Sequence, residues 1–83
     1  MIQTHDDEIG EAEAGRRLLV AEPVQATGMA GGKAITIPPG TYATVIRKAV
    51  RGKLDVSVRN GGGVYRLRVE RSQWGNMDLE PGR

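Results

Sequence analysis

The amino-acid sequence predicts an all-β fold, a small barrel of five to six short antiparallel strands that follows a mobile acidic arm. Short runs rich in β-branched residues recur along the chain, and glycine or proline turn signals separate them. No stretch carries the apolar period of a long helix. A chain of 83 residues is long enough for one domain with one small core.

The arm and the barrel are distinguished by their charge. Residues 1–15 hold five acidic residues and no Lys or Arg, whereas residues 16–83 hold all twelve Lys and Arg against five acids. Gly10 and Gly15 disfavour a helix in the first segment. We therefore predict a flexible arm over 1–15 and a barrel over 16–83. The arm is either a solubilising tail or a segment that folds across the basic face and competes with an anionic partner.

The first half of the barrel alternates strands with turns. Residues 17–26 are typical of a first strand, in which Pro23 marks an edge position or a bend because proline cannot donate a sheet hydrogen bond. A glycine-rich loop follows at 27–33, and then a short strand at 34–38. Residues 38–40, Pro-Pro-Gly, predict a turn, since proline fixes φ and glycine permits a positive φ.

The second half begins with a strand at 41–50, where β-branched side chains predominate. The Arg-Gly pair at 51–52 predicts a tight turn. The runs 53–59 and 64–71 alternate apolar and polar residues, which is the period of a strand with one buried face. Residues 60–63, between them, predict a hairpin loop.

The two alternating runs can be tested as a hairpin in which Arg59 faces Val64. Three apolar pairs then share one face: Val58 with Tyr65, Val56 with Leu67, and Leu54 with Val69. The other face pairs polar residues, twice with opposite charge: Ser57 with Arg66, Asp55 with Arg68, and Lys53 with Glu70. Each pair is worth roughly 0.2–1 kcal/mol, and a slip of one residue would mix the two faces. This register predicts that Tyr65 belongs to the core.

The preceding strand needs an irregularity. A plain two-residue turn at 51–52 would place Arg47 on the apolar face of the hairpin. A bulge near Lys48 or Ala49 would remove this conflict, and bulges are common where small barrels bend.

Two stretches resemble a known architecture. The stretch AITIPPGTYATVI, at 34–46, is similar to the short strand, P-x-G-T-x-x-x-V turn and next strand of SH3-like small barrels. The tail RSQWGNMDLEP, at 71–81, resembles their closing helical turn and last strand, here over 72–76 and 77–80. The resemblance covers about residues 17–81. It implies a fold and binding work: peptide recognition, nucleic-acid contact or docking onto a larger assembly.

Catalytic and cofactor motifs are missing from the sequence. The stretch from Gly28 to Ala34 fails as a phosphate-binding loop, because three residues separate its glycines instead of four and Ala34 follows the lysine. His5 lies beside Asp6 and Asp7, but no second histidine or cysteine completes a typical metal site. Serine residues in the barrel have no histidine base. We therefore expect no enzyme, no cofactor and no metal.

The basic residues are the first group of candidate site residues. Residues 47–71 hold eight basic residues against two acids, a balance that suits phosphate contact. The hairpin register assigns Arg68 to Asp55 and Lys53 to Glu70. The remaining candidates for anion or nucleic-acid binding are Arg47, Lys48, Arg51, Arg59, Arg66 and Arg71. Exposed aromatic residues for base stacking are scarce, which disfavours sequence-specific reading.

Tyr42 and Trp74 are the second group, as candidates for protein binding. Trp74 either closes the barrel as part of the core or lies beside Tyr42 and forms a ledge for a peptide. In a chain with one tryptophan and no phenylalanine, the core position is favoured.

The sequence thus predicts a non-catalytic binding module that contacts a protein partner. The alternative is a nucleic-acid-binding barrel that uses the basic 47–71 face, and a third hypothesis is an oligomeric enzyme with its site between barrels. The size is typical of the accessory, regulatory or inhibitory proteins that phages and plasmids encode. We expect a cytoplasmic location and no membrane association, because the chain lacks cysteine, a signal peptide and any long apolar run.

Overall fold

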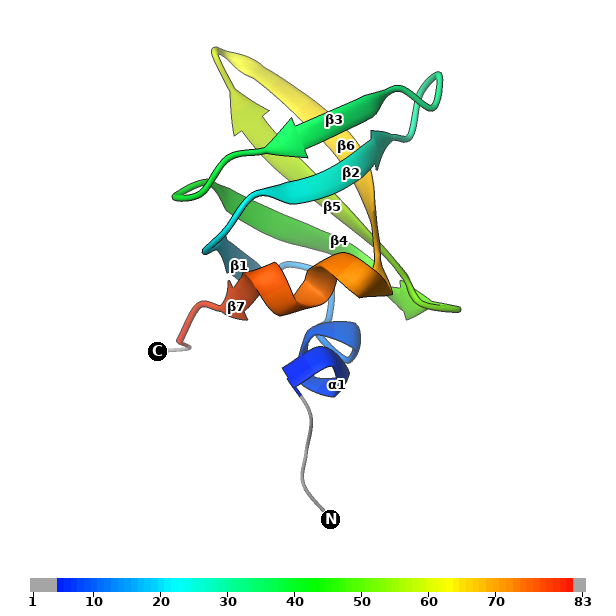
Figure 1. The fold of residues 1–83 in the computed structure, drawn as a ribbon, viewed down its shortest axis with the longest axis vertical. Coiled ribbons are helices and arrows are strands. Elements are labelled where there is room, and N and C mark those ends of the chain that lie inside the picture. Colours follow the sequence, from blue (N-terminus) through cyan, green and yellow to red (C-terminus); the bar gives the residue numbers. More distant parts are fainter. Residues whose placement is uncertain (1–4, 82–83) are drawn as a thin grey trace.

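The structure, a computed structural model, describes residues 5–81. Within these residues the chain forms one curled antiparallel sheet of seven strands in the order β3-β2-β6-β5-β4-β1-β7, a half-barrel with short helices at one end (Figure 1). The strands are β1 (Arg17–Val20), β2 (Val24–Gly28), β3 (Ala34–Ile37), β4 (Tyr42–Val50), β5 (Lys53–Asn60), β6 (Gly63–Glu70) and β7 (Met77–Leu79). The predicted small all-β, barrel-like fold is confirmed.

The predicted first strand is divided at Pro23, and this division is one source of the larger strand number. β1 lies between β4 and β7, whereas β2 lies between β3 and β6. The bend between them is held by Asn76, whose side-chain amide donates to the Pro23 carbonyl at 2.9 Å. The Asn76 carbonyl in turn accepts from the Ala21 amide at 2.8 Å. Pro23 is therefore a bend and not an edge residue.

The β5–β6 hairpin has the predicted register in every pair from Lys53–Glu70 to Arg59–Val64. Its loop is shorter than expected, because Asn60 also pairs with Gly63. The two residues left at the turn, Gly61 and Gly62, have φ of 62° and 90°. Two consecutive positive φ values are typical of the tight turns whose twist matches that of a hairpin.

β4 carries two irregularities where one was predicted. The register shifts between Val45 and Arg47 and again between Arg47 and Val50, in the region of the expected bulge. Val45 pairs with Val56 in the core, and Arg47 pairs with Asp55 on the outer face. The bulges thus keep the arginine out of the apolar interior.

The core is formed by aliphatic side chains and the indole of Trp74. Leu18, Val20, Leu54, Val56 and Val69 are fully buried. Trp74 lies on η1 (Arg71–Asn76) and is 3% exposed, and its indole N–H donates to the Val69 carbonyl at 3.1 Å. The predicted core position of the tryptophan is confirmed.

The flexible-arm prediction is wrong for the residues from His5 onward; its part at 1–4 lies outside the described residues. A short helix, α1 (His5–Gly10), packs against η1, and Ile9 is completely buried. Ala12 is also buried, and the Gly15 amide donates to the Val45 carbonyl at 2.8 Å. Two apolar residues three positions apart suffice to cover the Trp74 end of the core, a pattern too short to stand out in the sequence.

Candidate functional site

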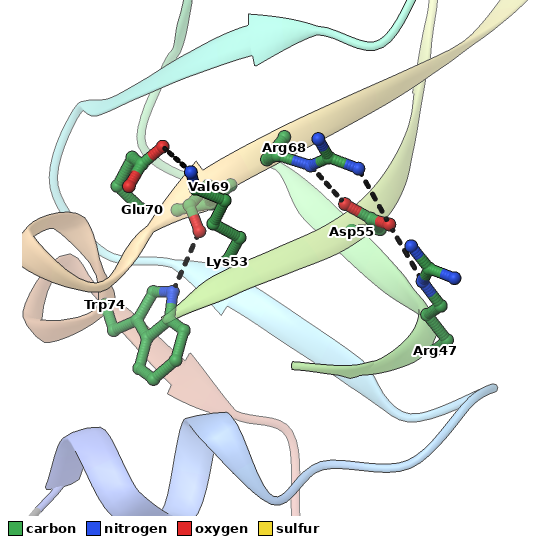
Figure 2. A network of polar contacts seen from close by, with 7 residues as sticks. All are labelled: Arg47, Lys53, Asp55, Arg68, Val69, Glu70 and Trp74. Carbon is green, nitrogen blue, oxygen red and sulfur yellow. Dashed lines mark hydrogen bonds and ion pairs between the residues drawn. The ribbon is translucent and has the colours of Figure 1, made fainter. Parts of the chain in front are cut away.

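Asp55 lies between two arginines on the outer face of the sheet (Figure 2). Arg68 Nε lies 2.9 Å from Asp55 Oδ1, and Arg47 Nε lies 3.1 Å from Oδ2. The side chain of Asp55 is only 4% exposed. Hydrogen bonds from Arg68, together with the positive charges of both arginines, lower the pKa of this carboxyl although burial opposes the shift. The predicted Arg68–Asp55 pair is confirmed, whereas Arg47, expected to be free, is engaged because the bulges turn it toward Asp55.

Arg71 is also engaged within the chain. Its guanidinium lies 3.3 Å from Asp7 Oδ1 and 3.8 Å from Asp6 Oδ2, and it lies over the Trp74 ring at 5.8 Å. The expectation of a free arginine is therefore wrong at this position. The acidic residues that were expected to lie in a flexible arm are held in α1, where they contact Arg71.

Four of the six predicted basic candidates have no acidic partner among residues 5–81, and they fall into two pairs. Lys48 and Arg51 lie near the β4–β5 turn, whereas Arg59 and Arg66 lie toward the β5–β6 turn. An eight-residue strand separates the two turns by about 25 Å, at roughly 3.4 Å per residue. The basic 47–71 segment is thus two separate groups of cations.

Tyr42 and Trp74 do not form a ledge, because the indole of Trp74 is buried. Tyr42 is 46% exposed, and the Arg17 guanidinium lies 4.3 Å from the centre of its ring. Arg17 is held there in part by Glu80, with Nε 3.1 Å from the carboxylate. Tyr42 therefore remains as an exposed aromatic residue without its expected neighbour.

The prediction that Tyr65 belongs to the core is wrong, because its side chain is 49% exposed. Its backbone is on the predicted face, opposite Val58. However, the β2–β6 ladder ends at Gly28 and Leu67, two residues short of Tyr65. Among residues 5–81, no strand pairs with β6 on that side beyond Leu67.

Two hollows adjoin Tyr65 and together form what we call the tip groove. The first, of about 180 Å³, opens between β3 and the ends of β5 and β6. The second adjoins the β2–β3 loop. Tyr65, Ile35 and Leu67 line both hollows. The first also contains Ile37, Val58 and Arg59, and the second Met29, Lys33, Val64 and Arg66.

Charge is segregated between the tip groove and the opposite end of the molecule. The groove is lined by Lys33, Arg59 and Arg66 and by no acidic residue. One acid of the described residues, Asp55, is buried between the arginines Arg47 and Arg68. The other acids lie in 5–22 and 70–80, which contain α1, β1, η1 and β7. In Figure 1 the two helices lie at the lower end, and the β5–β6 turn lies at the upper end. The surroundings of the tip groove are therefore positively charged.

His5 connects α1 to β7. Its Nε2 contacts the Met77 carbonyl and lies 3.8 Å from Asp78 Oδ1. Across residues 5–81, no three His, Cys, Asp or Glu side chains are grouped so that they could hold a metal ion. In the same part of the chain, no helix has the length and apolar character needed to cross a membrane.

Comparisons of the chain with protein-family models, with curated proteins and with solved structures find no match.

Proposed function

We propose that the protein is a non-catalytic binding module that contacts a protein partner through the tip groove. One observation carries this proposal: three of the five exposed large hydrophobic side chains among residues 5–81, those of Met29, Val64 and Tyr65, line the same hollow. Exposed apolar side chains that gather around a concavity mark interaction sites more often than scattered ones. A tyrosine suits such a site, because its ring buries a large area while its hydroxyl stays hydrated.

The SH3-like resemblance remains part of the proposal. It is supported by the hairpin series β4–β5–β6, by the helical turn η1 that follows, and by the pairing of β7 with β1. This order agrees with the closing turn and last strand expected from the sequence. Such barrels serve many different partners, so the fold alone supports binding but does not identify the ligand.

Nucleic-acid binding is the second candidate, and Tyr65 is also the observation that favours it. Its exposed ring lies in hollows that also contain Arg59 and Arg66. An aromatic ring flanked by arginines can stack a base while the cations contact phosphates. The protein partner is favoured because aliphatic side chains, among them Ile35, Ile37 and Leu67, make up much of the remaining lining of the first hollow.

Site-specific photo-crosslinking tests the proposal. A benzophenone amino acid replaces Tyr65 in one variant and Val50 in a matched control, since Val50 is 55% exposed at the far β4–β5 turn. After irradiation in cells of the native host, we expect a protein adduct from position 65 and none from position 50.

Two outcomes would contradict the proposal. Equal adducts from the two positions, or none, would remove the tip groove as a protein-binding site. An adduct at position 65 that nuclease digests and protease leaves intact would favour nucleic acid instead.

A further inference from the structure

We propose that the tip groove takes an extended acidic segment of the partner protein, which adds as a further strand to the free edge of β3 and places a carboxylate on Arg59. This inference rests on the proposed function, since it states which kind of protein segment the groove would bind.

β3 is an end strand of the sheet and pairs only with β2 among the described residues. The Gly28 amide donates to the Lys33 carbonyl at 2.7 Å, which identifies this pair as hydrogen-bonded. Because such pairs alternate along an antiparallel ladder, Ile35 also directs its main-chain groups toward β2. Ala34 and Thr36 then direct theirs away from the sheet, toward the free edge.

The first hollow of the tip groove lies along this edge. One wall consists of β3 residues Ile35, Thr36 and Ile37, followed by Pro38. The other wall comes from β5 and β6 and includes Val58 and Leu67. An added strand would hydrogen-bond to the edge and place every second side chain in the groove, the usual mode of recognition by strand addition.

The edge is short, which sets the expected strength of binding. β3 has four residues and is followed by two prolines, and both features limit pairing with other chains. Only Ala34 and Thr36 offer main-chain groups within the strand. The proposed contact is therefore reversible and depends on side chains as well as on main-chain bonds.

Charge selects the class of partner. Arg59 lines the first hollow, and Lys33 and Arg66 line the second. None of the three has an acidic partner within residues 5–81. An acidic segment would neutralise them. A second copy of this chain would instead bring the same cations together, which is unfavourable. A nucleic acid would contact one exposed tyrosine and an aliphatic wall, whereas single-strand binding sites offer a series of stacking rings.

The test uses a defined probe, the peptide acetyl-Glu-Val-Glu-Val-Glu-Val-amide, titrated into the ¹⁵N-labelled protein and followed by NMR. We expect the largest amide shifts at Ala34, Thr36 and Tyr65. The Lys-for-Glu version of the peptide should bind at least tenfold more weakly, because its charge repels the groove. A version with N-methylated valines should also bind at least tenfold more weakly, since it lacks the three valine N–H donors.

A pair of variants tests the role of Arg59. Arg59→Ala should weaken binding of the acidic peptide at least fivefold, whereas Arg51→Ala, the same charge change at the far turn, should leave it unchanged. Both side chains are exposed, so both variants should fold, and the NMR spectrum shows directly whether they do.

The inference is overturned if the acidic peptide does not bind, if the Lys version binds equally well, or if the shifts lie outside β3 and Tyr65. If a hexathymidylate shifts the same amides more strongly than the peptide does, the ligand of the groove is a nucleic acid and not an acidic protein segment. If the amide shifts of Ala34 and Thr36 depend on protein concentration alone, the edge of β3 binds a second copy of this chain and not an acidic segment.

The two proposals can fail separately. A protein adduct from position 65 combined with no binding of the acidic peptide overturns only the strand addition. The absence of a protein adduct overturns the proposed function and, with it, this inference.

Discussion

Arg68 and Asp55 face each other across β5 and β6, with Arg68 Nε 2.9 Å from Asp55 Oδ1. Asp55 is the one buried acidic side chain among the described residues, and its second oxygen accepts from Arg47 at 3.1 Å. Three consecutive strands are therefore joined through a single carboxylate (Figure 2). This arrangement stabilises the outer face of the sheet and engages Arg47 and Arg68, whereas Arg59 and Arg66 of the tip groove have no acidic partner among residues 5–81.

Asp55→Asn should lower the free energy of unfolding by about 1–3 kcal/mol, because two arginines lose their charged acceptor. The matched control is Glu70→Gln, which removes a carboxylate 3.8 Å from Lys53 in a solvent-exposed pair. Such a pair contributes about 0.2–1 kcal/mol at most. Urea unfolding of the three proteins measures the difference, and equal losses in the two variants would contradict the central role of Asp55.

Asp55 should also make stability depend on pH. Its pKa in the folded protein is lowered below the ordinary value of 3.8, chiefly by the hydrogen bond from Arg68. The stabilisation is therefore fully present above the pKa of the unfolded chain and is lost as the pH falls through the lower, folded value. The stability gap between the wild type and Asp55→Asn should stay constant at neutral pH and narrow below about pH 4. Urea unfolding between pH 2.5 and 7 tests this, and a gap independent of pH would contradict it.

Ile9→Ala should destabilise the protein by about 2–4 kcal/mol, since it removes a fully buried side chain from the core. A flexible arm would tolerate the same change without loss. Glu8→Ala, in the same helix at an exposed position, provides the control and should change stability by less than about 0.5 kcal/mol. If thermal or urea unfolding gives the same value for both variants, α1 does not pack as described.

Gly10→Ala should lower stability by about 1–3 kcal/mol through overpacking, although alanine favours helices. A Cβ at Gly10 would lie 2.8 Å from Trp74 Cζ3, on a buried ring that has little room to move. Gly75→Ala is the control, because nothing lies within 4 Å of its Cβ. Tryptophan fluorescence during unfolding reports both variants at Trp74, and a stabilising effect of Gly10→Ala would show that the helix can shift away.

The β5–β6 hairpin could be predicted residue by residue because its alternation is strict on both faces. The same pattern could not reveal that Tyr65 is exposed, because alternation determines the face of a residue but not whether a neighbouring strand extends far enough to cover it. Arg47 was assigned as free because the position of the bulges, which turn it toward Asp55, depends on packing. α1 escaped prediction because the segment 5–15 holds one isoleucine and two alanines among five acids, which gives almost no periodic signal.

The tip groove was missed for a related reason. Its residues come from three separated parts of the chain, 28–41, 58–60 and 64–67. Each part by itself has the composition of a loop or a strand. Only the curvature of the sheet brings β3 opposite β5 and β6, and curvature follows from bulges and turns that sequence patterns locate only approximately.

The segregation of charge has a kinetic consequence. Acids at the α1 end and cations around the tip groove give the molecule an electric dipole along the direction that joins them. The electric field of a negatively charged partner would rotate the molecule so that the tip groove faces the partner before the two surfaces touch. Association should therefore slow steeply as ionic strength rises, while dissociation, governed by the contacts within the groove, should change little.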